Sequence, residues 1–89
     1  MTLEEEARRA GKAREILENE LFKEAVKAVE GALLTGIRMS AFKDAELREK
    51  LCQQYILLHS VVEQIKTHIE TGKLAEASLA QKVLRAAFR

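Results

Sequence analysis

Proline is absent from this sequence of 89 residues, and tryptophan is absent as well. A chain without proline lacks the strongest breaker of helices, which suits long helical segments. Aromatic side chains are also scarce, with one tyrosine and three phenylalanines. The sequence therefore shows no row of aromatic platforms on which nucleic-acid bases could stack.

Cysteine occurs once, as Cys52, so the chain cannot form an internal disulfide framework. One cysteine and two histidines also fall short of the usual zinc-ligand spacings. No apolar run approaches the roughly 18 residues of a membrane-spanning helix. Glu4, Glu5 and Glu6 make the N-terminus acidic, where a signal peptide is basic. We expect no membrane partner and a location in a reducing cytoplasm.

The abundant residues are those that favour helices. Leu, Ala, Glu, Lys, Arg and Gln lose little conformational freedom in a helix, and they dominate the composition. Hydrophobic residues make up 47% and charged residues 33%, a balance typical of a folded globular domain. The net charge is only +1, so no overall field directs the protein to nucleic acid. The predicted fold class is all-α.

Capping residues divide the sequence into four expected helices within a single domain over residues 1–89. Thr2 and Asn19 are good N-caps, and Gly72 is a good C-terminal stop. The helices are expected at about residues 3–18, 20–38, 45–71 and 75–88. We predict a small helical bundle built on a long antiparallel hairpin of the second and third helices. It has three main helices and a short C-terminal helix.

Apolar residues at helical spacing mark the faces that should form the core. In the second helix, Ala25, Ala32 and Gly36 flank the apolar face. In the third helix, the apolar residues from Leu51 onward follow the heptad spacing of a helix seam. The predicted core residues are Phe22, Val26, Leu33, Leu51, Leu58 and Val62.

The middle of the third helix, from Tyr55 to Val62, is apolar almost all round. An apolar arc this wide is more than one antiparallel neighbour would cover. We therefore predict that the chain forms a homo-oligomer or binds another protein here. The predicted interface residues are Tyr55, Ile56, Leu57 and Val61.

Residues that could carry chemistry are few and badly placed for it. His59 and His68 are separated so that they lie on opposite faces of one helix. Cys52 and His59 share a face, but their backbones are about 10.5 Å apart, too far for a nucleophile and its base. No glycine-rich phosphate loop is present. We predict no enzyme activity, no catalytic, metal-binding or cofactor-binding residues, and no cofactor.

The C-terminal end is the one clearly asymmetric part of the charge pattern, since basic residues outnumber acidic ones there. Lys82, Arg85 and Arg89 are the candidates for contact with nucleic acid or with a protein partner. The alternative is that these residues only keep a terminal helix in solution. Nucleic acid is the less favoured partner, because the chain has little net charge and few stacking residues.

Four short segments carry a resemblance to a known group of proteins. They are AREILEN at residues 13–19, LFKEA at 21–25, DAELREKL at 44–51 and IETGKLA at 69–75. With them the chain resembles a family of short helical proteins encoded by tailed bacteriophages and prophages, in the virion morphogenesis region near portal, capsid and terminase genes. The resemblance implies a role in assembling or completing the particle, in the host cytoplasm or in the virion. It brings no catalytic or ligand-binding residues.

Three functions follow as hypotheses. The first is a non-enzymatic structural or assembly protein of a phage particle, which acts through its apolar helix faces as a homo-oligomer or as an adaptor on other phage structural proteins. The second is a small DNA-linked factor, such as a small terminase-like subunit or a regulator, whose basic ends touch phosphates. The third is an inhibitor that binds a host protein. We favour the first.

Overall fold

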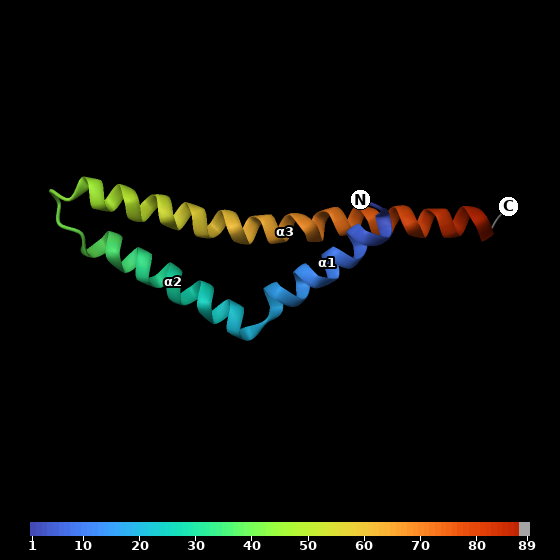
Figure 1. Ribbon diagram of the computed structural model, residues 1–89, viewed down its shortest axis with the longest axis horizontal. Coiled ribbons are helices and arrows are strands. Elements are labelled where there is room, and N and C mark those ends of the chain that lie inside the picture. Colours follow the sequence, from blue (N-terminus) through green and yellow to red (C-terminus); the bar gives the residue numbers. More distant parts are fainter. Residues whose placement is uncertain (88–89) are drawn as a thin grey trace. The chain divides into compact units, whose positions relative to one another are not determined.

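The computed structural model describes residues 1–87, in which it has three α-helices and no strand (Figure 1). The helices are α1 (Leu3–Glu18), α2 (Glu20–Met39) and α3 (Ala45–Ala87). The all-α fold class is therefore confirmed. None of the three helices is both long and apolar enough to cross a membrane.

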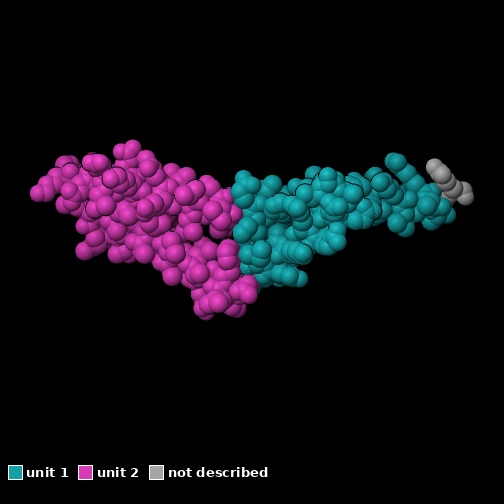
Figure 2. Space-filling model, viewed as in Figure 1, with its two compact units in different colours: residues 1–18, 64–89 teal, residues 19–63 magenta. Residues whose placement is uncertain are grey.

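The chain divides into two compact units (Figure 2). Unit 1 comprises residues 1–18 and the chain from residue 64 onward, and unit 2 comprises residues 19–63. α1 thus belongs to unit 1 and α2 to unit 2, while α3 contributes residues to both. The single domain over residues 1–89 stays a prediction.

α2 begins and ends at residues that satisfy its terminal backbone groups. Asn19 Oδ1 accepts a hydrogen bond from the Phe22 amide at 2.9 Å, which is the N-cap expected from the sequence. At the other end, the Ser40 amide donates to Ile37 O at 3.3 Å and Ser40 Oγ donates to the same oxygen at 2.7 Å. α2 ends at Met39, and Ser40 is its C-cap. The bonds at both ends supply partners to backbone groups that have none within the helix.

A single arginine holds the turn between α2 and α3. Arg48 Nη1 donates to Ser40 Oγ at 3.0 Å and to Ala41 O at 3.1 Å. Its Nη2 donates to Phe42 O at 3.2 Å. A planar guanidinium presents several donors in fixed directions, and a lysine has no equivalent geometry. Arg48 thereby fixes the path of residues 40–42.

Within unit 2, α2 lies beside the first part of α3 and runs in the opposite direction (Figure 1). Gly36 faces the Leu51 side chain and Glu30 faces His59, so a later position in α2 meets an earlier position in α3. A Cβ on Gly36 would lie 3.1 Å from Leu51 Cδ1, so glycine allows the two helices to approach closely at this point. The predicted core residues are half-buried: Phe22, Val26, Leu33, Leu51, Leu58 and Val62.

Within unit 1, α1 packs against the C-terminal part of α3 through small residues. A Cβ on Gly72 would collide with the Ala10 Cβ and would lie 3.3 Å from the Glu6 carbonyl oxygen. At the edge of this contact, Arg14 Nη1 lies 3.7 Å from Glu76 Oε1. The two helices therefore meet almost backbone to backbone. The buried residues of unit 1 are Ala10, Ala13, Gly72 and Ala75.

The prediction that a helix ends at Gly72 is wrong, and so is the prediction of a separate helix over residues 75–88. α3 continues without interruption from Ala45 to Ala87, and residue 88 lies outside the described residues. None of the glycines has the positive φ by which a glycine usually ends a helix. The physical reason lies in unit 1, where the missing side chain of Gly72 makes room for Ala10 instead of allowing a turn.

Candidate protein interface

Most large apolar side chains of the described chain are in contact with solvent. Over residues 1–87 the buried apolar side chains belong to alanines, and no larger side chain is buried. Leucine, isoleucine and valine are normally among the most buried residues of a folded protein. In unit 2 apolar residues are exposed on α2, on α3 and in the turn between them, where Phe42 is 97% exposed.

The group on α3 contains three of the four predicted interface residues. Ile56 is 64% exposed, Leu57 is 65% exposed and Val61 is 53% exposed. Leu57 and Val61 are one helical turn apart and share a side of α3. Ile56 lies about 100° around the helix from Leu57 and about 140° from Val61, so it belongs to a different side. The structure therefore brings Leu57 and Val61 together and separates Ile56 from them.

Tyr55, the fourth predicted interface residue, is half-buried. Its ring lies 4.5 Å from the ring of His59, measured between centroids, at an interplanar angle of 48°. His59 Nε2 lies 2.9 Å from Glu30 Oε2. That nitrogen is buried and makes no hydrogen bond of good geometry, so the contact with Glu30 is an ion pair only when the imidazole is protonated. Tyr55 thus packs on His59 within α3, and His59 is the residue that contacts α2.

The group on α2 is a row of six exposed residues, which we call the alanine strip. Its long side chains are at the ends, where Leu21 is 74% exposed and Met39 is 75% exposed. Its members follow one another at intervals of four, three, four, three and four residues, the spacing of a helix seam that packs on another helix. They are Leu21, Ala25, Ala28, Ala32, Thr35 and Met39.

The charged residues of α2 occupy one arc of the helix, and one edge of that arc adjoins the alanine strip. At 100° per residue, all the charged residues of this helix fall within an arc of about 120°. The alanine strip lies outside that arc, and Val29, which is 48% exposed, lies beside the strip on the side away from the charges. The charged residues are Glu20, Lys23, Glu24, Lys27, Glu30 and Arg38.

The alanine strip is the part of the site that sequence reasoning missed. Ala25 and Ala32 were expected to flank a core face, because the apolar arc of α2 is continuous there. The structure uses one edge of that arc, including Gly36, for contact with α3 and leaves Ala25 and Ala32 exposed. The four-three spacing from Leu21 to Met39 was a signal that could have identified the strip as a second seam.

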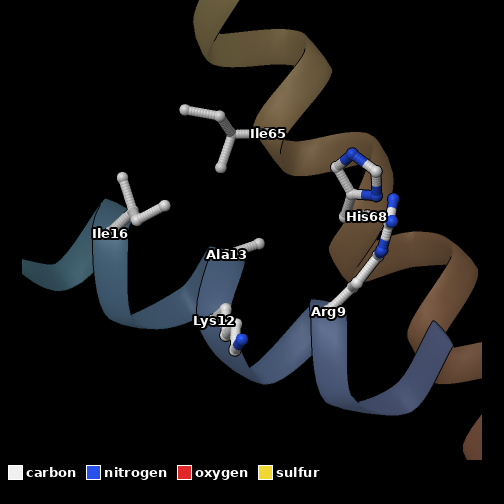
Figure 3. A pocket seen from close by; sticks show the side chains of 6 residues that line it. All are labelled: Arg9, Lys12, Ala13, Ile16, Ile65 and His68. Carbon is white, nitrogen blue, oxygen red and sulfur yellow. The ribbon is translucent and has the colours of Figure 1, made fainter. Parts of the chain in front are cut away.

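Unit 1 contains a shallow pocket of about 150 Å³ with a basic rim (Figure 3). Arg9 and Lys12 of α1 and His68 of α3 line it, and Figure 3 shows Arg9 reaching toward His68. The apolar part of the lining comes from Ala13, Ile16 and Ile65. Within residues 1–87, no three residues among His, Cys, Asp and Glu are arranged to hold a metal ion.

Two of the three basic C-terminal residues belong to the described part of unit 1. Lys82 and Arg85 are exposed on the last part of α3. Arg89 lies outside the described residues. On the same part of α3, Val83 and Leu84 are also exposed, so basic and apolar side chains are mixed there.

Comparison with known proteins adds no relative to this picture: no family model, no curated protein and no solved structure matches the chain.

Proposed function

We propose that this chain is a non-enzymatic assembly protein of a tailed phage, built on a helical hairpin, which works in virion morphogenesis through its apolar helix faces. It acts as a homo-oligomer or as an adaptor on other phage structural proteins. The phage setting rests on the resemblance of the four sequence segments. The mode of action rests on the exposed surfaces of α2 and α3.

The observation that carries the proposal is the mismatch between what the chain buries and what it exposes. Its buried apolar side chains are Ala10, Ala13 and Ala75, while Leu57 and Met39 are mostly in solvent. Exposed apolar groups of this size mark protein interaction sites when they are contiguous. A second protein surface would complete the core that the single chain leaves open.

The energetics favour such a role. Full burial of a leucine, isoleucine or methionine side chain contributes about 1.5–3 kcal/mol. Covering the exposed parts of Ile56, Leu57 and Val61 would contribute on the order of 4 kcal/mol, before the cost of association is subtracted. The small chain has little hydrophobic core of its own to offset its conformational entropy. Association would therefore stabilise the fold as well as the complex.

A phage that encodes this chain provides the test. With the gene deleted, we expect phage DNA replication and lysis to continue while complete particles, counted by electron microscopy and by plaque titre, are lost. Supplying the chain from a plasmid should restore them. A normal yield of infectious particles without the chain would overturn the proposal.

The same experiment separates the competing functions. Closed but empty heads would indicate a DNA-packaging factor, and purified protein should then bind DNA with a steep dependence on salt. Replacing Lys82, Arg85 and Arg89 by glutamine should abolish that binding. Loss of replication, with a one-to-one complex between the chain and a host protein, would indicate an inhibitor.

A further inference from the structure

We propose that two copies of the chain associate through the alanine strip, with α2 of one copy antiparallel to α2 of the other. The inference rests on the proposed function, since it names the partner of the exposed surface of α2 as a second copy of this chain. Three properties of the strip indicate this partner: the spacing of its residues, the sizes of their side chains and the charges beside them.

The spacing of the strip is the same in both directions along the helix. Intervals of four, three, four, three and four residues read identically from Leu21 to Met39 and from Met39 to Leu21. A reversed copy therefore meets the strip in register. Leu21 then faces Met39 of the second copy, and Ala28 faces Ala32 of the second copy.

The side-chain sizes suit this register. The centre of the strip consists of Ala25, Ala28 and Ala32, which allow two helix axes to approach to about 8 Å. The long side chains of Leu21 and Met39 stand at the two ends, where they are the most exposed members of the strip. In the antiparallel register each end of the contact holds one leucine and one methionine. No long side chain then has to fit between the alanines at the centre.

The charges beside the strip select the antiparallel orientation. Glu24, Gly31 and Arg38 are spaced seven residues apart along one edge of the strip. In the antiparallel register Glu24 lies beside Arg38 of the second copy, and the two-fold symmetry repeats this pair. In a parallel register Glu24 would lie beside Val29 of the second copy and gain no partner. Exposed ion pairs at the edge of a contact add little affinity, but they determine the orientation of the two helices.

Gly31 is the residue that meets itself. It stands midway between Glu24 and Arg38, so the two-fold axis places it beside Gly31 of the second copy. A Cβ added to Gly31 would have nothing within 4 Å in its own chain. A cysteine is therefore tolerated there and reports directly on the antiparallel register.

The experiment uses the full chain with Cys52→Ser, which removes the native thiol. Gly31→Cys in this background should give a disulfide-linked dimer on mild oxidation. The matched control is Lys27→Cys, which is also on α2 but in the middle of its charged arc, and which should remain largely unlinked. If Gly31→Cys links no better than the control, the antiparallel register is wrong.

Ala32→Glu tests the strip itself. Light scattering should show that this variant dissociates, with a dissociation constant raised at least about 100-fold, because the association would bury an unpaired charge. Its circular dichroism should be that of the wild type, since Ala32 is exposed. Lys27→Glu is the control and should leave the dimer intact. An Ala32→Glu variant that still forms the dimer, or a wild-type chain that is monomeric at all concentrations, would overturn the inference.

Particle yield in the gene-deletion experiment does not depend on either result, so the proposed function succeeds or fails separately.

Discussion

Gly72 of α3 faces Ala10 of α1 with no room for a side chain between them. The Glu6 carbonyl oxygen lies 3.3 Å from the place that a Cβ of residue 72 would occupy. Because these neighbours are backbone or the first atom of a side chain, they cannot move aside without a shift of a whole helix.

Gly72→Ala should therefore destabilise unit 1, by about 1–3 kcal/mol, the usual cost of overpacking. The measurement is the free energy of unfolding in urea, followed by circular dichroism. Gly11→Ala in α1 is the control, because a Cβ there would have nothing within 4 Å. It should stabilise the protein by up to about 1 kcal/mol, as alanine favours a helix over glycine. Equal effects of the two substitutions would contradict the close contact.

The turn between α2 and α3 should depend most on Arg48, which bonds to it from α3. Arg48→Lys keeps the charge but loses the fork that serves Ser40, Ala41 and Phe42, so we expect a loss of about 1–2 kcal/mol in the free energy of unfolding. Lys50→Ala is the control, because its contact with Glu46 is an exposed ion pair at 3.7 Å and should cost less than about 0.5 kcal/mol. Full stability of Arg48→Lys would show that charge alone holds the turn.

The contact between Glu30 and His59 should contribute to the packing of α2 on α3. A double-mutant cycle of Glu30→Ala and His59→Ala, measured as free energies of unfolding, should give a coupling energy of up to about 1 kcal/mol, because both side chains are partly exposed. A coupling energy near zero would mean that His59 acts mainly through its contact with Tyr55.

Val62 and Ile56 should separate the packed side of α3 from its exposed side. Val62→Glu places a charge on a half-buried position and should lower the free energy of unfolding by several kcal/mol, about 3–5 where the charge stays unpaired. Ile56→Glu should leave the helix content unchanged, since Ile56 is exposed. Melting curves by circular dichroism compare the two, and unfolding of Ile56→Glu would place Ile56 inside the fold.

Local signals account for what could be read from the sequence. Asn19 predicts the start of α2 because an N-cap bonds only to residues next to it in the sequence. The many helix-favouring residues predict the all-α class. The prediction that a helix ends at Gly72 failed for the same reason. The neighbouring residues in the sequence do not distinguish a glycine that ends a helix from a glycine that makes room for another helix. Only the contact with Ala10, which is distant in sequence, distinguishes them.

The exposure of apolar residues on α2 and α3 could be predicted only in part, for a related reason. An apolar arc wider than one contact predicts that part of it stays exposed, and Leu57 and Val61 are exposed. Their role as an interface stays a prediction. The width of the arc does not show which edge of the arc the intramolecular contact uses. On α2 that choice depends on Gly36 meeting Leu51, so the exposure of Ala25 and Ala32 became visible only in the structure.

The alanine and glycine contact of unit 1 also sets how the protein responds to temperature. Methyl groups and backbone bury little apolar area, and apolar area is what gives unfolding its large positive heat-capacity change. Unit 1 should therefore have a heat-capacity change below the usual 12–15 cal/mol/K per residue. Its stability curve would be shallow, with little loss on cooling and a broad, gradual thermal transition.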